Sequence, residues 1–205
     1  MHVFGYSRVR REIQDILIAM FGLTLAFSIA TFSHHSFRLS VYQVFYYLGL
    51  SLAAVCLAFL AHELSHRQVA RRYGGFAEFR VWPMGLLGGI LFSFLGIVLA
   101  APGAVYMEGV FGKDRIGKTA LAGPFTNLVL GLAFLAAGIL FYGNFLVFPL
   151  GYLSQINLYL GAFNMIPFAP LDGQKVMSWN MRYYVVAFGS MILLAVLSFI
   201  IFGGI

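Results

Sequence analysis

The stretch Leu60-Ala61-His62-Glu63-Leu64-Ser65-His66 lies at the end of an uncharged run that begins at residue 39. A helix over that run is long enough to cross a hydrocarbon core about 30 Å thick at about 1.5 Å per residue. Ionisable side chains at such a position each cost about 2.5–3.5 kcal/mol on insertion scales, so by default they mark a functional site with partners. The stretch therefore predicts a membrane-spanning helix that ends in a polar site.

The polar residues of this stretch have the spacing of the H-E-x-x-H motif. On a helix, residues four apart lie one above the other, so His62 and His66 can direct both imidazoles at one metal ion. Glu63 then stands beside the ion, where a carboxylate can take a proton from a water that zinc has activated, which is the chemistry of peptide hydrolysis. The alternative interpretation is a helix end at the membrane surface whose polar residues face water, but such an end has no need of this spacing.

The composition agrees with a membrane protein. Of the 205 residues, 61% are hydrophobic and 10% are charged, and the mean hydropathy is +0.89, which excludes an ordinary soluble protein. The single cysteine, Cys56, excludes a disulfide framework and a set of thiolate ligands. The net charge of +6 comes from basic residues in short connections between apolar runs, which indicates topology signals and no nucleic-acid partner. We expect one membrane domain over residues 1–205, without an appended soluble domain.

Basic residues also predict how the spans are oriented. Three arginines between residues 8 and 11 precede a first uncharged run at residues 16–32, and three more arginines at residues 67–72 follow the second run. Short loops rich in Lys and Arg stay in the cytoplasm. Both groups of arginines therefore place the N-terminus in the cytoplasm and the stretch from His62 to His66 toward the cytoplasmic side.

The second half of the chain predicts three further crossings. Residues 119–171 carry no charge and are numerous enough for two spans joined near Tyr142-Gly143-Asn144. Residues 183–205 supply a final span, with Trp179 and Tyr183 as anchors at the membrane interface. The expected fold class is therefore an all-α polytopic protein of the cell membrane with about five transmembrane helices.

The segment between the second and third spans predicts a short strand and a re-entrant hairpin. Residues 76–82 alternate large apolar with smaller or charged side chains, which favours a strand. Residues 81–107 carry no charge, and their number would also allow a true span. A single crossing would put Lys113 and Lys118 outside, and glycines and prolines interrupt the run. A membrane-associated re-entrant β-hairpin is therefore favoured over a span.

A zinc ion held by two histidines needs a third protein ligand. The chain has seven acidic residues, and setting aside those in polar connections or beside the hairpin leaves Asp172. It ends an apolar run in Asn164-Met165-Ile166-Pro167-Phe168-Ala169-Pro170-Leu171-Asp172-Gly173, where two prolines preclude an ordinary helix. An unwound segment can direct a side chain sideways at an ion. The alternative interpretation is an exit turn in which Asp172 caps the next helix.

Three blocks together resemble the site-2 protease family of intramembrane zinc metalloproteases. They are His62-Glu63-Leu64-Ser65-His66, Gly123-Pro124-Phe125-Thr126-Asn127 and the run from Asn164 to Gly173. The likeness covers roughly residues 39–173, and the blocks occur in the family's order. The resemblance implies that His62, His66 and Asp172 bind one Zn²⁺ per chain and that Glu63 is the catalytic carboxylate.

The same resemblance implies two further roles. Asn164 would help to position the substrate backbone as a second catalytic residue, and residues 101–106 would form a strand near the active site. Residues 85–100 depart from the family's pattern, because they are longer and more apolar than its usual hairpin. Asn127 is open to two interpretations, as an ordinary hydrogen bond between helices or as support for the site.

The sequence therefore predicts an intramembrane zinc metalloprotease that cleaves transmembrane substrates near the cytoplasmic side, as in regulated intramembrane proteolysis. Its expected partners are transmembrane protein substrates and the lipid bilayer. One alternative is a prenyl-protease-type membrane zincin, whose third ligand is a Glu from a later helix, but no Glu follows Glu108. The other is a non-catalytic membrane adaptor of the same fold, which would be free to lose the costly charges of Glu63 and Asp172.

Overall fold

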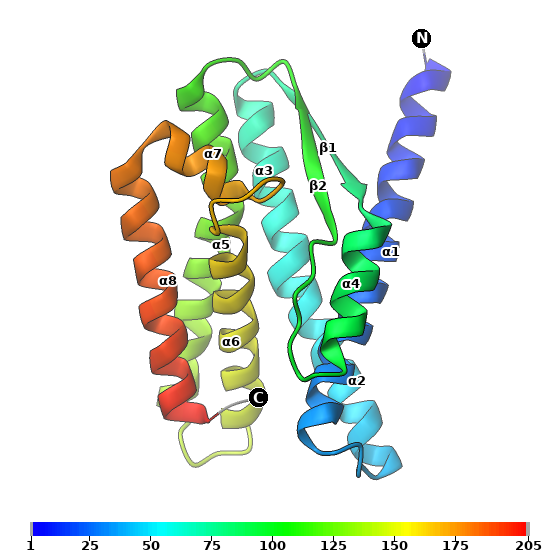
Figure 1. Ribbon diagram of the computed structural model, residues 1–205, viewed down its shortest axis with the longest axis vertical. Coiled ribbons are helices and arrows are strands. Elements are labelled where there is room, and N and C mark those ends of the chain that lie inside the picture. The colour runs from blue at the N-terminus through cyan, green and yellow to red at the C-terminus, as the bar shows by residue number, and fades with distance from the viewer. Residues whose placement is uncertain (1, 204–205) are drawn as a thin grey trace. The chain divides into compact units, whose positions relative to one another are not determined.

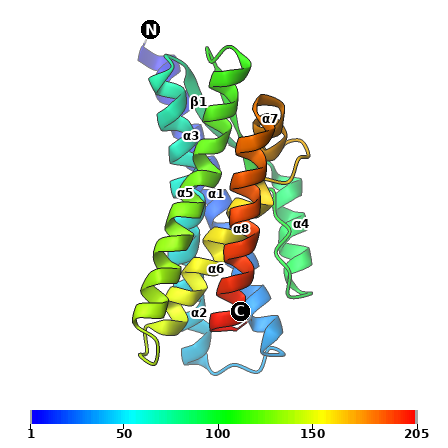
Figure 2. The same ribbon diagram turned by 90° about the vertical axis from the view of Figure 1, so that its left-hand side faces the viewer.

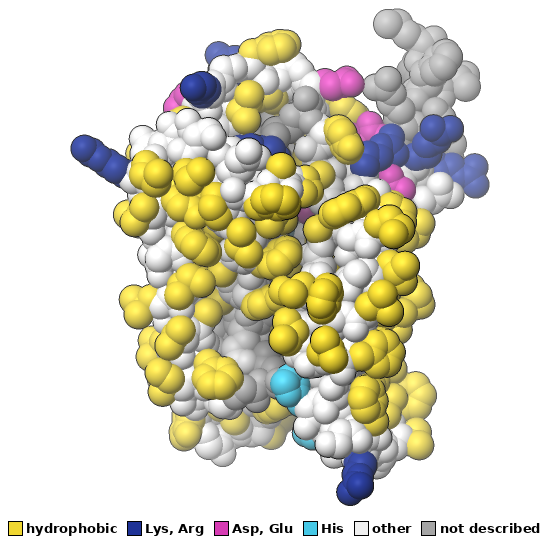
Figure 3. Space-filling view, viewed as in Figure 1, with side chains coloured by type: hydrophobic (Ala, Val, Ile, Leu, Met, Phe, Trp, Pro, Cys, Tyr) yellow, Lys and Arg dark blue, Asp and Glu magenta, His cyan; other side chains and the backbone are white. Residues whose placement is uncertain are grey.

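The chain consists of helices and one small two-stranded sheet (Figure 1). The computed structural model describes residues 2–203, and describes side chains from Arg10 onward apart from that of Met107. Among the described residues, four helical stretches are long and apolar enough to cross a membrane, namely Arg10–His34, Val41–Arg72, Lys113–Leu140 and Met181–Phe202. Large apolar side chains are exposed on the faces of these helices (Figure 3). The architecture is that of a helical membrane protein, as expected.

The number of spans stays a prediction. The fifth expected span corresponds to α6 (Val147–Asn164), whose interior carries polar residues such as Gln155 and Asn157, so it is not among those four stretches. The predicted orientation of the N-terminus depends in part on Arg8, whose side chain lies outside the described residues, as do the last two residues of the expected final span. The single domain expected over residues 1–205 also stays a prediction, and the chain divides into two compact units.

The first unit comprises residues 1–55 and 77–106. It contains α1 (His2–His34), α2 (Val41–Val55), α4 (Pro83–Ser93) and the strands β1 (Phe76–Val81) and β2 (Gly103–Glu108), which reach one or two residues beyond it. Helix α1 packs against both α2 and α4. A Cβ atom at Gly22 of α1 would lie 2.6–2.8 Å from the Leu86 side chain of α4, so the two helices approach this closely only because Gly22 has no side chain.

The segment between the two strands leaves the sheet and returns to it. Trp82 N donates to Pro102 O at 2.8 Å, so both ends of the segment lie together. Its far turn contacts the last residues of α1, where Ser33 Oγ donates to Phe94 O at 3.0 Å and His34 Nε2 lies 3.2 Å from Gly96 O. A segment that returns to its starting point fits a re-entrant arrangement, but whether it crosses a membrane stays a prediction.

The strand expected at residues 76–82 is confirmed as β1, and the one expected at residues 101–106 is β2, displaced by two residues. The connection between them differs from the expected β-hairpin, because its first limb is the helix α4. Pro83 has no N–H and a fixed φ, which suits the first position of a helix. A helix also satisfies the backbone groups of an apolar limb internally, which a two-stranded hairpin with open edges cannot do in lipid.

A cluster of charged residues in the first unit joins β1 to α1, and we call it the Arg80 cluster. The Arg80 guanidinium lies 3.1 Å from Asp15 Oδ2 and also pairs with Glu78. Glu12 Oε1 accepts a hydrogen bond from Phe79 N at 3.3 Å. The cluster contains both a cation and anions, so part of the cost of burying its carboxylates is offset within the chain.

The second unit comprises residues 56–76 and 107–205. It begins with a π-helix at Cys56–Leu60 that continues into α3 (Ala61–Arg72), and then contains α5 (Lys113–Leu140), α6, α7 (Asp172–Trp179) and α8 (Met181–Phe202). Helix α5 packs against all four of the other α-helices, and α5 and α6 run alongside each other in both views (Figures 1 and 2). The turn expected near Tyr142-Gly143-Asn144 joins them. Helix α5 is therefore the element that links the segments carrying the motifs.

Candidate metal centre

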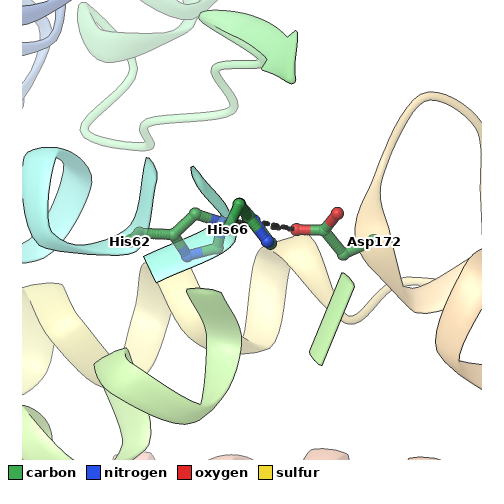
Figure 4. A group of neighbouring side chains, drawn as sticks. All are labelled: His62, His66 and Asp172. Atoms are coloured by element: carbon green, nitrogen blue, oxygen red, sulfur yellow. Dashed lines mark hydrogen bonds and ion pairs between the residues drawn. The ribbon is translucent and has the colours of Figure 1, made fainter. Parts of the chain in front are cut away.

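Three buried side chains with metal-ligating atoms meet in the second unit (Figure 4). His62 and His66 come from α3 and are each 3% exposed, and Asp172 at the start of α7 is 8% exposed. We call this group the His–His–Asp cluster. His62 Nε2 lies 2.9 Å from His66 Nε2, and Asp172 Oδ2 lies 3.2 Å and 3.0 Å from these two nitrogens. One atom from each side chain thus faces a common point.

The spacing of the three atoms fits a zinc ion. Ligands about 2.0–2.1 Å from a tetrahedral Zn²⁺ are separated from one another by about 3.3 Å. The three measured separations lie between 2.9 and 3.2 Å, slightly below that value. Two imidazoles and one carboxylate are also a usual zinc ligand set that leaves a fourth position open. The His–His–Asp cluster is therefore able to hold one Zn²⁺.

Helix α5 determines which nitrogen of each imidazole faces the cluster. His66 Nδ1 lies 2.7 Å from the backbone oxygen of Thr119. A carbonyl oxygen can only accept, so His66 Nδ1 donates, and the Nε2 atom of the neutral ring carries the lone pair that a metal needs. His62 Nδ1 lies 2.6 Å from Asn127 Oδ1. The block that contains Asn127 and the block that contains Asp172 thus both contact the histidines of the H-E-x-x-H motif.

Gly123 makes room for the two imidazole rings. A Cβ atom at this position would clash with His66 Nε2 and would lie 2.6 Å from His62 Nε2. Any side chain here would push the rings away from their common point or separate α5 from α3. The glycine of the Gly-Pro-Phe-Thr-Asn block is therefore required by the clearance beside the metal ligands.

The predicted third ligand, Asp172, is the first residue of α7 and directly follows the loop after α6. Helix α6 ends at Asn164, and α7 begins at Asp172, so residues 165–171 with their two prolines form the unwound segment that was expected. Residue Leu171 occupies the N-cap position of α7 without a side-chain hydrogen bond, and Asp172 directs Oδ2 at the two imidazoles instead of capping the helix. The other oxygen, Oδ1, lies 3.6 Å from Lys175 Nζ.

The charge on Asp172 is governed by two opposing effects. Burial raises the pKa of its carboxyl group, whereas the protonated forms of His66 and His62 beside it lower that pKa, and the net shift is downward. A metal cation between the three ligand atoms acts in the same direction. The ionised carboxylate, which is the form that binds zinc, is therefore the favoured form.

Glu63 has a carboxylate oxygen without a partner. Its Oε2 atom is buried and accepts no hydrogen bond from any described residue. Buried polar atoms are normally paired, so an orphaned carboxylate oxygen next to the metal ligand His62 indicates a group that acts on something outside the chain. Its role as the catalytic carboxylate stays a prediction that fits this position.

Asn164 is the last residue of α6. Its Nδ2 atom donates to Leu160 O of its own helix at 2.9 Å. The side chain is half-buried, and its predicted role in positioning the substrate backbone is not decided by this bond. That role stays a prediction.

The structure also reveals two contributors that sequence reasoning did not name. Thr119 acts through its backbone oxygen, so its side chain carries no signal of the role. Asn157 in α6 accepts from Asn127 Nδ2 at 3.2 Å and is fully buried. Its signal was an amide within an otherwise mostly apolar helix, where polar side chains commonly join helices.

Several proteins of known name are similar to this chain. A protein of Methanocaldococcus jannaschii named "Putative zinc metalloprotease MJ0611" is 42% identical over 183 residues, which cover 88% of this chain and 89% of that protein. "Putative zinc metalloprotease Rip3" of Mycobacterium tuberculosis is 36% identical over 139 residues, which cover 65% of this chain and 31% of that protein. "Zinc metalloprotease MJ0392" of M. jannaschii is 32% identical over 117 residues, which cover 57% of this chain and 30% of that protein.

The similarity thus extends over nearly the whole of one relative and over less than a third of the other two. The chain matches no family model, and no solved structure matches it significantly. The names of all three relatives include zinc, in agreement with the ligand set and spacing of the His–His–Asp cluster.

Proposed function

The chain belongs to the site-2 protease family of zinc metalloproteases, and from this membership we propose that it cleaves transmembrane proteins within the membrane, near its cytoplasmic side. One observation carries the proposal. The His–His–Asp cluster and the orphaned Glu63 carboxylate lie near the end of Val41–Arg72, a helical stretch apolar enough to span a bilayer. A hydrolytic site at that place acts on peptide bonds at the level of the membrane.

His62, His66 and Asp172 would hold the zinc ion, which supplies a Lewis acid and lowers the pKa of a water to about 7 when bound. The remaining chemistry belongs to the chain. Glu63 has a buried oxygen free to take a proton from the attacking water and to pass it to the leaving amine. Thr119 O and Asn127 Oδ1 hold the imidazole rings, so both histidines keep their ligating nitrogens directed at one point.

The substrate must arrive extended. A peptide bond in a transmembrane helix is covered by its own turn, and its carbonyl is already hydrogen-bonded. Local unwinding therefore precedes cleavage, and we infer a preference for single-span substrates with Gly, Asn or Pro near the cut bond. In the two-stranded sheet, each strand has a partner on one side only, so β2 has a free edge that can pair with an extended segment.

A reconstituted cleavage assay tests this proposal. One substrate helix is compared with a version whose weak residues are changed to Leu, and the cut is mapped by mass spectrometry. The Leu version is expected to be cut more slowly, and the cut is expected near the cytoplasmic end of the helix. Equal rates, or a cut in the exposed tail far from the membrane, would contradict the proposal.

The proposed topology has its own test. With Cys56 changed to Ala, single cysteines replace Lys113 or Lys118, and both are expected to react with an impermeant reagent from the cytoplasmic side only. Lys113 and Lys118 both lie exposed in the first two turns of α5, where an impermeant reagent can reach them. Labelling from outside would show that residues 83–106 cross the membrane, and the re-entrant arrangement would be withdrawn.

A further inference from the structure

Asn127 is a fully buried amide that joins three elements of the second unit. It lies on α5 and is 0% exposed. Its Oδ1 atom is 2.6 Å from His62 Nδ1 on α3. Its Nδ2 atom donates to Ala58 O of the π-helix at 3.0 Å and to Asn157 Oδ1 on α6 at 3.2 Å. All the hydrogen-bonding atoms of this side chain are therefore directed at specific partners.

Backbone carbonyls determine the orientation of this amide. Ala58 O can only accept, so the Asn127 atom that faces it must be the nitrogen, and the oxygen must face His62. The neighbouring amide is determined in the same way, because Asn157 Nδ2 donates to Leu153 O at 2.8 Å and turns its Oδ1 toward Asn127. The two backbone oxygens Ala58 O and Leu153 O thus determine which atom donates and which accepts in each hydrogen bond of this network.

The consequence reaches the metal ligand. Because Asn127 presents an oxygen, His62 Nδ1 must donate, and the neutral imidazole is left with its lone pair on Nε2. That nitrogen is the one that faces His66 Nε2 and Asp172 Oδ2. His66 obtains the same tautomer from the backbone oxygen of Thr119, which no substitution removes. His62 alone depends on a side chain for it.

We propose that Asn127 is a positioning residue that selects the zinc-binding tautomer of His62 and holds its ring, with Ala58 O and Asn157 keeping the amide in the required sense. The π-helix helps to orient Asn127. The regular i→i−4 hydrogen bonding is interrupted over Cys56–Leu60, so the carbonyl of Ala58 can accept a hydrogen bond from a side chain. The inference rests on the zinc site and not on proteolysis, so its test measures zinc affinity and tautomer rather than cleavage.

The test compares variants of the purified full chain by zinc competition with a chelator. Asn127→Leu keeps the approximate size and removes the acceptor, and its zinc affinity is expected to fall by about 10- to 100-fold, as for other outer partners of metal-ligating histidines. Asn127→Asp keeps an acceptor for His62 Nδ1 but turns a second oxygen toward the acceptors Ala58 O and Asn157 Oδ1, so it is expected to recover only part of that loss. If Asn127→Leu binds zinc normally, the proposal is wrong.

Two further variants separate positioning from packing. Ser154→Ala removes a buried hydrogen bond between α6 and α5, from Ser154 Oγ to Gly131 O, away from the cluster, and should leave zinc affinity unchanged. Asn157→Leu removes one of the two acceptors of Asn127 Nδ2 and should lower the affinity less than Asn127→Leu does. If Ser154→Ala weakens zinc binding as strongly as Asn127→Leu, general loosening explains the result and the proposal fails.

A spectroscopic readout is independent of affinity. In zinc-free protein labelled with ¹⁵N-histidine, the ring nitrogens of His62 should report a proton on Nδ1 in the wild type. In Asn127→Leu the same signals should shift toward a mixture of tautomers, whereas those of His66 should not change. A His62 spectrum that is unaffected by Asn127→Leu would overturn the assignment.

Discussion

The Arg80 cluster and the His–His–Asp cluster are both built from charged or ionisable side chains shielded from solvent, but they differ in the source of positive charge. In the first, the Arg80 guanidinium pairs with both Asp15 and Glu78. In the second, two imidazole nitrogens and a carboxylate oxygen face one another at 2.9–3.2 Å. The first group contains a cation of its own, whereas the second group brings three acceptor atoms together and calls for a cation.

This difference separates a structural polar cluster from a functional one. Burying charge is costly unless it is paired, so a chain that only needed to join α1 to β1 could supply the partner itself, as Arg80 does. The ligands of the second group instead have every other nitrogen occupied by α5, through Thr119 O and Asn127 Oδ1. Each of the two imidazoles therefore has one nitrogen held by α5, while the other nitrogen faces the carboxylate of Asp172, which is the arrangement of a metal site rather than of an ion pair.

The largest effect is expected from removing a ligand. His66→Ala or Asp172→Ala leaves two ligands at an open site, and zinc affinity should fall by more than the about 10- to 100-fold typical of an outer partner. Metal analysis of the purified variant measures it, with one zinc per chain expected for the wild type. Full zinc content in Asp172→Ala would show that another residue is the third ligand, and the contrast between the Arg80 cluster and the His–His–Asp cluster would no longer hold.

The next effect concerns Glu63. Glu63→Gln keeps the size of the side chain but cannot accept a proton, so cleavage should fall by about 10²- to 10⁴-fold while zinc content stays at one per chain. Substrate cleavage and metal analysis on the same preparation separate the two quantities. Cleavage at a near-normal rate would end the assignment of Glu63 as the base, and loss of zinc would show that it belongs to the metal shell.

A smaller effect, of a different kind, is expected at the Arg80 cluster. Arg80→Met leaves Asp15 and Glu78 without their cation and should lower the free energy of unfolding by about 1–2 kcal/mol, less than for a fully buried pair because the Arg80 side chain is 31% exposed. Thermal unfolding in detergent measures the loss. Zinc content should not change, and a loss of zinc in this variant would blur the distinction between the two clusters.

The smallest effect is expected at Lys175. Its ammonium group lies 3.6 Å from Asp172 Oδ1 and is 31% exposed, so it repels a bound cation only weakly. Lys175→Met should tighten zinc binding by up to about fivefold, corresponding to about 1 kcal/mol for a solvated charge. Lys118→Met, which breaks the exposed pair with Asp114, is the matched control and should have no effect. Weaker zinc binding in Lys175→Met would instead show that the lysine positions Asp172.

Much of the fold could be predicted from short-range patterns. Hydropathy and turn-forming residues predict the ends of the apolar runs, the turn between α5 and α6 and the strand β1, because each of these depends on consecutive residues. The connection after β1 was harder to predict, because an uncharged run rich in glycine is compatible with a span, a hairpin or a short helix. The contacts of its turn with Ser33 and His34 show where the segment folds back against α1, and no local pattern contains them.

The sequence by itself determined that this is a helical membrane protein with an H-E-x-x-H pair at the end of a span and few acidic residues available as a third ligand. These properties follow from hydropathy and from the 3.6-residue turn, which act over neighbouring residues. Only the tertiary structure decided that Gly123 clears space for the rings, and that Thr119 O and the amide of Asn127 orient them. The physical reason is that a carbonyl oxygen or a glycine acts on the site only through the residue it lies against. That residue belongs to a helix distant in the chain, so no local sequence pattern identifies the contact.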